Sequence, residues 1–463
     1  MNGSGGAVVI EGGHVATVDA AGSEYPAGHL VAEAGRIVAV GPGPVPPGLA
    51  DGAARIDGSG LLVTPGLVNT HTHLYQWLTR GYATSQGLFG WLETLYPVWA
   101  RLTPELVRDA AAASLAWLAL TGCTTSTDHL YVFPAGQDAA GLLEAEILAA
   151  RQVGVRFHPT RGSMDLGQSA GGLPPDGVVE THDAVLAASE AAIDRWHDPS
   201  FGAMTRIAIA PCSPFSATAE LMRDCAELAR ARGVRLHTHL AETADEEEFC
   251  LATFGRTPAQ YVEDLGWLGP DVWLAHCVHL SGDAVTRIGR TGTGVAHCPT
   301  SNGRLGAGIA PVRGLLDAGT AVGLGVDGSA SNESGRMIGE LHQALLAARY
   351  AGGAGALTAR DALRMGTMGG ARCLGWDGEI GSLEPGKLAD LAVWRVDGLP
   401  GAGIEDPLTT LVFGAPALEH LFVGGHQVVT GGQLATADAG PLAEAAAKAS
   451  AAIARRDPRG AGR

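Results

Sequence analysis

The chain has 463 residues and a formal net charge of −17, so it is long enough for one large domain and a smaller one. Its acidic balance argues against nucleic acid or an anionic membrane as a partner, because both select basic surfaces. The amino end lacks a basic segment before its short apolar run, and no apolar run reaches a membrane-spanning length. Seven scattered cysteines without a C-x-x-C pair fit reduced thiols, so we expect a cytoplasmic protein.

The two ends of the chain share a β-rich pattern. Short apolar runs separated by glycine and proline predict strands at residues 7–10, 14–18, 29–33 and 36–40. Similar runs return at residues 388–394, 419–423 and 427–430, with Gly424-Gly425 as a hairpin turn. Because these distant segments have the same pattern, we predict one small β-sandwich domain that combines residues 1–64 and 382–436.

Residues 65–381 alternate β-rich runs with helical stretches rich in Ala, Leu and Glu, such as 103–121 and 219–232. The candidate strands are residues 68–73, 124–128, 155–160, 207–210, 234–240, 272–276, 294–298 and 322–326. Eight β/α units predict an α/β fold, a (β/α)8 TIM-type barrel. A doubly wound sheet is the alternative, disfavoured because no Gly-rich phosphate turn follows the first strand. The Ala-rich tail, residues 437–463, predicts one helix and a disordered end.

The most informative motif is Pro65-Gly-Leu-Val-Asn-Thr-His-Thr-His73, at the end of the first predicted barrel strand. Side chains two residues apart in a strand point to the same face, so His71 and His73 can reach one point. Histidine is the commonest metal ligand, and two buried imidazoles would be costly to desolvate without a partner. The motif therefore predicts half of a metal site.

The other half is expected at the carboxyl ends of later strands, where (β/α)8 barrels place their functional residues. Strand five ends in His237-Thr-His-Leu-Ala-Glu242, strand six in Ala275-His-Cys-Val-His-Leu280 and strand eight in Gly325-Val-Asp-Gly328. Zinc takes nitrogen and oxygen ligands, and a catalytic zinc site keeps one position open for water. These strand ends predict a metal site. Histidines elsewhere are expected to be hydrogen-bonded structural residues: His129, His158, His182 and His197.

The motifs together resemble the amidohydrolase superfamily, and more narrowly its branch of S-adenosylhomocysteine, guanine and 8-oxoguanine deaminases and s-triazine hydrolases. They follow the family order over nearly the whole chain. Besides the motif ending at His73, they are His239-Leu-Ala-Glu242, Ala275-His-Cys-Val-His-Leu280, His297-Cys-Pro-Thr-Ser-Asn302, Gly325-Val-Asp-Gly328 and Ile380-Gly-Ser-Leu-Glu-Pro-Gly-Lys-Leu-Ala-Asp-Leu391.

The resemblance implies one divalent metal, zinc or alternatively iron, with His71, His73, His239 and Asp327 as ligands. His237 lies on the same strand face as His239, so spacing alone does not choose between them. The H-x-x-E pattern that His239 forms with Glu242 matches the family branch and favours His239 as the metal ligand. His237 is expected to support a ligand or to belong to the core. Relatives with two metals bridge them through a carboxylated lysine, and this chain has no lysine between residues 1 and 386.

The resemblance also implies catalytic roles. Asp327 would take the proton of the attacking water, His276 would orient that water, and Glu242 would protonate a ring nitrogen of the substrate. His297 is expected either to touch the site or to be structural. His279 is expected to be structural, because three residues along a strand point it away from His276.

Loop motifs narrow the substrate. Four of them look most like those of 8-oxoguanine deaminases: Tyr75-Gln-Trp-Leu-Thr-Arg80, Leu88-Phe-Gly-Trp-Leu-Glu-Thr-Leu-Tyr-Pro-Val-Trp99, Asp128-His-Leu-Tyr-Val-Phe-Pro134 and Arg161-Gly-Ser-Met-Asp-Leu166. The resemblance thus implies hydrolytic deamination of a purine-like heterocycle, with 8-oxoguanine giving urate and ammonia. An s-triazine of the hydroxyatrazine type or a pterin is the alternative substrate. A non-catalytic scaffold is the remote alternative.

The candidate substrate contacts follow from side-chain chemistry. Gln76 can donate and accept hydrogen bonds along a purine edge, and Arg161 can contact ring carbonyls in a bidentate manner. Trp91 and Tyr131 can wall a flat ring, and Asn302 can bond its edge. We therefore expect a small nitrogen heterocycle as partner, with neither nucleic acid nor membrane, and a homo-oligomer, as is usual in the family.

Overall fold

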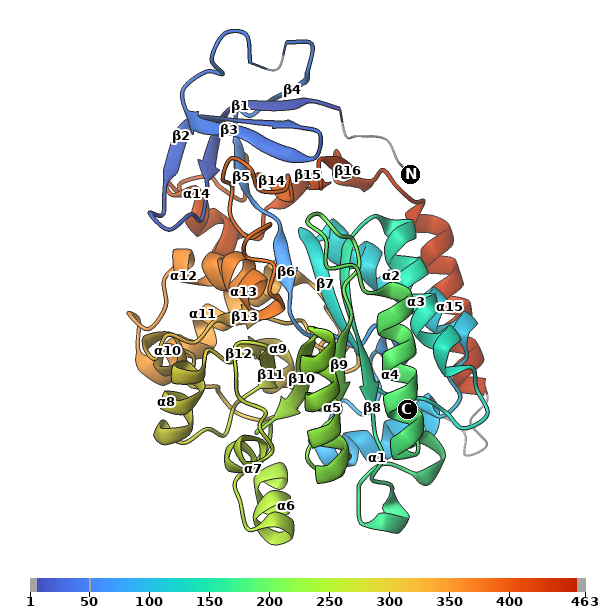
Figure 1. Cartoon of the computed structure of the whole chain (residues 1–463). Coiled ribbons are helices and arrows are strands. Elements are labelled where there is room, and N and C mark those ends of the chain that lie inside the picture. Colours follow the sequence, from blue (N-terminus) through green and yellow to red (C-terminus); the bar gives the residue numbers. More distant parts are fainter. Residues whose placement is uncertain (1–5, 50, 456–463) are drawn as a thin grey trace.

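The computed structural model describes residues 6–49 and 51–455 (Figure 1). A closed parallel barrel carries helices around it, and a separate sheet lies at one end, where the first and last strands of the chain meet (Figure 1). This arrangement confirms the predicted fold class. The predicted disordered end lies outside the described residues from 456 onward.

The separate sheet contains nine strands in the order β17-β16-β15-β14-β5-β1-β2-β3, with β4 paired to β1. These strands are β1 (Val8–Ala16), β2 (Glu24–Glu33), β3 (Arg36–Pro42), β4 (Ala54–Asp57), β5 (Leu61–Pro65), β14 (Leu391–Arg395), β15 (Ala417–Val423), β16 (His426–Thr430) and β17 (Gln433–Leu434). Antiparallel pairing of β5 with β14 joins the two chain ends, as predicted. Strands that we expected as a sandwich are thus hydrogen-bonded in one sheet, and the domain boundaries stay a prediction.

One strand in this sheet differs from the sequence prediction. Residues 7–10 and 14–18 were expected as two strands, and the structure forms the single strand β1 across them. The register against β2 shifts on both sides of Gly13, which marks a bulge. Gly12 has φ +86°, a conformation that only glycine adopts readily, so the bulge absorbs the residues that looked like a turn.

All neighbouring barrel strands pair in parallel, and the barrel closes through Leu324 of β13 and Asn69 of β6. The strands are β6 (Leu67–Asn69), β7 (Cys123–Leu130), β8 (Arg156–Ser163), β9 (Ala208–Pro211), β10 (Arg235–Leu240), β11 (Val272–His276), β12 (Gly294–His297) and β13 (Val322–Leu324). Closure excludes the doubly wound alternative. β6 ends before His71, so the two motif histidines lie in an extended segment just past the strand rather than inside it.

The helices cover the barrel. The α-helices are α1 (Leu88–Trp99), α2 (Pro104–Leu120), α3 (Ala139–Val153), α4 (His182–Trp196), α5 (Ala219–Arg232), α6 (Ala244–Phe254), α7 (Pro258–Asp264), α8 (Gly282–Thr291), α9 (Pro299–Arg304), α10 (Val312–Asp317), α11 (Met337–Gly352), α12 (Ala359–Arg364), α13 (Gly370–Leu374), α14 (Pro407–Thr409) and α15 (Ala439–Arg455). The 3-10 helices are η1 (Leu74–Thr79), η2 (Gln168–Ala170) and η3 (Asp176–Val178), and the π-helices are η4 (Met365–Gly369) and η5 (Thr410–Gly414).

Local sequence explains the helix ends. The Thr103 side chain accepts a hydrogen bond from the Leu106 amide at the start of α2, and Gly233 ends α5 in the left-handed conformation. The tail helix α15 lies beside α2 (Figure 1). Its Ile453 is fully buried, and the Ile453 carbonyl accepts a hydrogen bond from Arg101.

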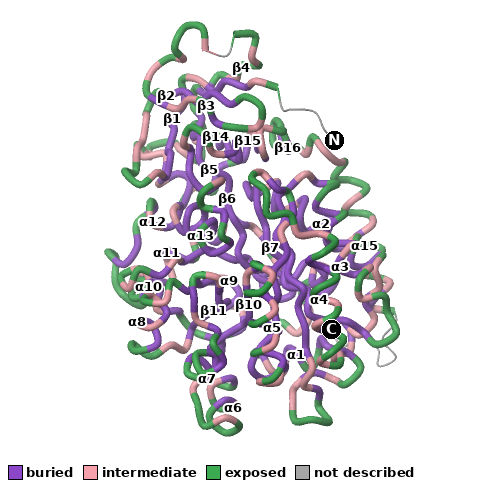
Figure 2. Tube along the Cα trace, in the orientation of Figure 1, coloured by how far each residue is buried: buried purple, intermediate pink, exposed green. Residues whose placement is uncertain are grey.

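The most deeply buried segments are strands of the barrel (Figure 2). The strands β7, β8, β11 and β12 are buried along their whole lengths, while the surrounding helices alternate between buried and exposed faces (Figure 2). Helices cover the outside of such a barrel and side chains fill its interior, so each strand is expected to be buried on both of its faces. Among the described residues, every helix falls short of the length and apolarity that crossing a bilayer would need.

Candidate active site

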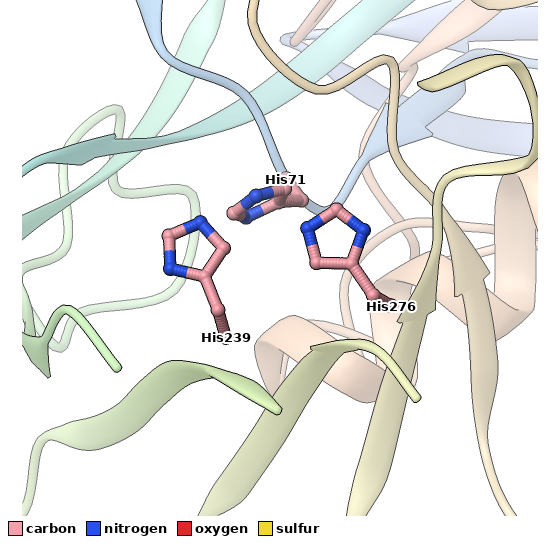
Figure 3. Close-up of side chains that lie close together, drawn as sticks. All are labelled: His71, His239 and His276. Carbon is pink, nitrogen blue, oxygen red and sulfur yellow. The ribbon is translucent and has the colours of Figure 1, made fainter. Parts of the chain in front are cut away.

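Three histidines and one aspartate converge at the carboxyl ends of the barrel strands. Nε2 of His71 lies 3.4 Å from Oδ1 of Asp327, and Nε2 of His73 lies 3.3 Å from the same oxygen. Nε2 of His239, from the end of β10, lies 3.2 Å from Nε2 of His73. His276, from the end of β11, adds a further imidazole beside His71 and His239 (Figure 3). Chain segments that are far apart in sequence thus meet as predicted from their strand-end positions.

Hydrogen bonds behind two of these rings determine which nitrogen faces the centre. Nδ1 of His73 lies 2.7 Å from the His129 carbonyl oxygen, and Nδ1 of His239 lies 2.7 Å from the Cys212 carbonyl oxygen. A carbonyl only accepts, so each Nδ1 carries a hydrogen. In the neutral rings each Nε2 therefore carries a lone pair. The two Nε2 atoms lie beside each other, and that of His73 also faces Asp327.

His237 orients the third ring. Its Nδ1 donates to the Trp273 carbonyl oxygen at 2.8 Å, so its Nε2 is an acceptor in the neutral ring. That Nε2 lies 2.8 Å from Nδ1 of His71, which must donate. Nε2 of His71 is left as a buried lone pair without a hydrogen-bond partner in the described part of the chain. Three convergent imidazole lone pairs and a carboxylate oxygen suit a divalent metal ion.

Burial keeps these ligand candidates in their metal-binding protonation states. It lowers the pKa of His71 to about 3 and the pKa of His239 well below its usual value, so both rings are neutral at pH 7. The pKa of Asp327 lies well below its ordinary value, although burial opposes this. The site therefore combines neutral imidazoles with an ionised carboxylate.

Asp327 is held on both of its oxygens. Oδ1 accepts a hydrogen bond from the Gly328 amide at 2.7 Å. Oδ2 accepts hydrogen bonds from the hydroxyls of Ser301 at 2.6 Å and Ser331 at 3.1 Å. Asp327 has φ +60°, an uncommon conformation for a residue with a side chain, and such strain collects at functional sites. The backbone and the two serines thus keep the carboxylate in one orientation.

Glu242 and His276 form the acid–base side of the site. Nε2 of His276 lies 3.6 Å from Oε2 of Glu242 and 4.0 Å from Oδ2 of Asp327. Burial raises the pKa of Glu242 well above its usual value, and the charge of Asp327 adds to the effect. The raised pKa favours the protonated form of Glu242, which can donate a proton. Its backbone amide donates to Glu246 at 2.9 Å, which fixes the turn after β10.

A pocket of about 360 Å³ opens onto this cluster. It is lined by His73, Gln76, Leu88, Trp91, Leu92, Tyr96, Tyr131, Cys212, Phe215, His239, Glu242, His276, Leu305 and Asp327. Three of the predicted substrate contacts, Gln76, Trp91 and Tyr131, therefore face the pocket. Gln76 is fully buried, and neither its amide oxygen nor its amide nitrogen has a hydrogen-bond partner within the described ranges. The remaining wall is largely apolar and aromatic, which suits a flat ring.

The other two predicted contacts lie outside the lining of this pocket. The guanidinium of Arg161 bonds both carboxylate oxygens of Glu180, at 2.7 and 2.9 Å, and lies 3.7 Å above the Phe133 ring. Oδ1 of Asn302 lies 3.0 Å from Nδ1 of His276 and orients that ring. Nη2 of Arg161 is engaged by Glu180, whereas Nδ2 of Asn302 has no hydrogen-bond partner in the described part of the chain.

The structure also places beside the site two residues that the sequence analysis did not assign to it. His129, expected to be structural, stacks on His239 with ring centroids 4.7 Å apart, and its Nε2 donates to the Ala210 carbonyl oxygen. Cys212 holds His239 through its carbonyl and also lines the pocket. Their positions at the ends of β7 and β9 were the available signal, because every barrel strand end faces the site. His297 is buried beside this region but outside the pocket lining.

The barrel and the strand-end cluster define the class of protein. The family model described as "Amidohydrolase family" matches residues 62–428. This span is most of the chain, so the chain belongs to the amidohydrolase family.

Individual relatives narrow the comparison. The chain is 49% identical over 435 residues to the 8-oxoguanine deaminase of Pseudomonas aeruginosa, a match that covers 92% of this chain and 95% of that one. It is 39% identical over 402 residues to an isoxanthopterin deaminase from an unknown prokaryotic organism, covering 82% and 83%. The solved structure of the Arthrobacter aurescens atrazine chlorohydrolase complexed with zinc aligns with a TM-score of 0.90 and 34% identity, over 96% of this chain and 100% of that chain. These relatives confirm the predicted family and branch.

Proposed function

We propose that this protein is a metal-dependent deaminase that converts 8-oxoguanine and water into urate and ammonia. The observation that carries the proposal is the meeting of a buried carboxylic acid with a raised pKa, a second carboxyl group and imidazole nitrogens beside a pocket whose other walls are largely apolar and aromatic. The 49% identity to an 8-oxoguanine deaminase supports the choice of substrate.

The proposed metal ligands are Nε2 of His71, His73 and His239 together with Oδ1 of Asp327. Zinc is the proposed ion, supported by the zinc complex of the related chlorohydrolase, and iron fits the same donors. Such an ion would act as a Lewis acid and lower the pKa of a bound water toward 7. His237 orients His71 for this role through the 2.8 Å contact between their rings.

The remaining steps are proton transfers by side chains. With Nδ1 of His276 donating to Asn302, its Nε2 accepts a hydrogen bond from the attacking water and orients it toward the carbon that bears the amine. Asp327 takes one water proton, and Glu242 donates its proton to the adjacent ring nitrogen. Asp327 then returns its proton to the leaving amine, which departs as ammonia. Glu242 recovers a proton from the new hydroxyl as the ring carbonyl forms.

The pocket walls would select a planar ring. Trp91 and Tyr131 line the slot, and the indole nitrogen of Trp91 is fixed by a 3.2 Å hydrogen bond to the Ala330 carbonyl oxygen. Gln76 supplies one donor and one acceptor to the ring edge. Asn302, predicted from sequence as a contact, orients His276 in this arrangement, while Arg161 bonds Glu180 outside the pocket lining.

We also propose a homo-oligomer in a reducing compartment, in keeping with the family resemblance and with seven cysteines that are buried and free of disulfides. Gel filtration with light scattering measures the assembly, and a monomer would contradict this part of the proposal.

The test of function is ammonia release from a panel of 8-oxoguanine, guanine, isoxanthopterin and hydroxyatrazine, together with metal analysis of the purified protein. We expect about one metal ion per chain, and a kcat/KM for 8-oxoguanine at least about tenfold above the others, which is a difference of about 1.4 kcal/mol. Urate should appear in step with ammonia. A protein that stays inert after zinc and iron are supplied would refute the enzyme proposal, and preference for isoxanthopterin or hydroxyatrazine would replace the substrate.

A further inference from the structure

Two acidic side chains face each other beneath the histidine motif, outside the site described above. Asp128 lies near the end of β7, and Glu146 lies in the middle of α3. Both side chains are fully buried, and neither belongs to the pocket lining. Two carboxyl groups buried together are costly unless they are hydrogen-bonded, so their position calls for an explanation.

One oxygen of the pair has an evident task. Oδ1 of Asp128 accepts a hydrogen bond of 2.6 Å from the backbone amide of Leu74. Leu74 begins η1, and the His73 side chain makes no capping hydrogen bond to that helix. Asp128 therefore caps η1 from a neighbouring strand. His73 directly precedes Leu74, the capped residue. Gln76 lies in the same helical turn, and the backbone amide of Gln76 donates a 3.0 Å hydrogen bond to the His73 carbonyl oxygen.

The other three oxygens need a proton. Oδ2 of Asp128 and both carboxyl oxygens of Glu146 are buried and receive no hydrogen bond from any donor in the described chain. The two carboxyl groups are within hydrogen-bonding reach of each other. Ionised carboxylates only accept, so a hydrogen bond between the two groups forms only when one of them is protonated and donates to the other.

Electrostatics determine which of the two holds that proton. Burial raises the pKa of Glu146 well above its usual value, and the charge of Asp128 raises it further. Burial also raises the pKa of Asp128, but the hydrogen bond from the Leu74 amide opposes this. The proton therefore resides on Glu146 and the charge on Asp128.

We propose that Glu146 is a positioning residue: its carboxylic O–H donates to Asp128, which in turn holds the Leu74 amide and so fixes both His73 and Gln76. The chain of contacts runs from α3 through β7 to η1, and it links one proposed metal ligand with the proposed reader of the substrate edge. The inference rests on the proposed function only for the identity of the substrate that Gln76 meets.

The first experiment compares Glu146→Gln with Glu146→Leu. The Gln side chain keeps an N–H donor toward Asp128, whereas Leu leaves Oδ2 of the buried Asp128 carboxylate without a donor. We expect Glu146→Leu to weaken zinc affinity, measured by chelator competition, by about tenfold or more, as is typical when a group that orients a metal ligand is lost. Glu146→Gln should stay within about threefold of the wild type. The KM for 8-oxoguanine should rise in Glu146→Leu along with any change in kcat, because Gln76 moves with the same turn.

Amide hydrogen exchange measures directly how well the turn that begins η1 is held in place. In Glu146→Leu, exchange in a peptide spanning residues 70–80 should be faster than in the wild type, and Glu146→Gln should restore its protection. Ile147→Ala is the matched control, because Ile147 is a buried neighbour on α3 and its loss weakens packing without removing the donor. This control should lower the melting temperature and leave zinc affinity and exchange at 70–80 unchanged.

A second pair of variants tests the same contact from the other side and serves if Glu146→Leu does not fold. Asp128→Asn keeps an acceptor for Leu74 and gains a donor toward Glu146, so zinc affinity should stay within about threefold of the wild type. Asp128→Ala removes the cap and should lower zinc affinity by about tenfold or more.

Equal zinc affinity and equal exchange in Glu146→Gln and Glu146→Leu would overturn the proposal, as would an equal loss in Ile147→Ala. Equal behaviour of Asp128→Asn and Asp128→Ala would also overturn it. Zinc affinity and exchange do not depend on the substrate turned over. A wild type inert toward 8-oxoguanine would therefore refute the proposed function while a Gln–Leu difference at Glu146 still supports the positioning role.

Discussion

Replacing Gln76 by methionine is expected to raise the stability of the free protein and to lower its activity. The Gln76 side chain is fully buried, and both of its amide atoms lack hydrogen-bond partners within the described residues. A substrate edge would provide those partners, so the free protein carries a cost that binding relieves. Methionine has similar length and no branch, so Gln76→Met removes the polar atoms and leaves the packing against Gly328 largely intact.

The magnitudes follow from the unpaired amide. An unsatisfied buried polar group costs about 1–3 kcal/mol. Removing it should therefore stabilise the free protein by about that amount. With an unfolding entropy of about 2.1 cal/mol/K per residue, a chain of 463 residues gains roughly 1 °C in Tm per kcal/mol, so we expect a rise of about 1–3 °C. Losing the same interaction with the transition state should lower kcat/KM for 8-oxoguanine by about 5- to 150-fold.

The assay combines thermal melting of the zinc-loaded protein with initial rates of ammonia release. Thr320→Val is the matched control, because the Thr320 hydroxyl is also buried without a partner in the described chain but lies before β13, away from the pocket. It should raise Tm and leave kcat/KM unchanged. A Gln76→Met variant with unchanged kcat/KM, or with a lower Tm than the wild type, would refute the reasoning that this amide is reserved for substrate.

Three other predictions concern the acid, a ligand support and pH. Glu242→Gln should lower kcat by about 10²- to 10⁴-fold with metal content retained, because a positioned acid contributes that much, and wild-type activity would exclude the role. His237→Phe should weaken zinc binding by about 10- to 100-fold in chelator competition, since His71 loses its acceptor; unchanged affinity would mean that this contact is dispensable. Burial raises the pKa of Glu340 to about 7, so between about pH 4.5 and 7 the folded state keeps a proton that the unfolded state releases, and stability falls as pH rises. The Tm of Glu340→Gln should therefore rise relative to that of the wild type as the pH increases across that window. A Tm difference that stays constant with pH would contradict the raised pKa.

Much of the fold follows from local patterns. Alternating β and helical runs predicted the barrel, and matching β texture at both ends predicted the shared sheet. The predictions that were wrong are local. The first barrel strand was predicted to reach His73 but ends at Asn69, and the expected turn at Gly12 is a bulge within β1. Both depend on hydrogen bonds to partner strands, and sequence periodicity does not encode which amides find them.

The sequence by itself determined the class of fold and the strand ends that meet at the site, because period-two spacing and strand-end position are local properties of the chain. The choice of His71, His73, His239 and Asp327 as metal ligands came from the family resemblance and stays a prediction. The sequence also identified Gln76 and Glu242 through the motifs around them. Only the tertiary structure decided how these residues are supported. It placed Arg161 on Glu180 and Asn302 on His276, and it brought Glu146 of α3 onto Asp128. The physical reason is that support depends on which buried polar atoms remain unpaired after strands and helices pack, and that accounting exists only in the folded chain.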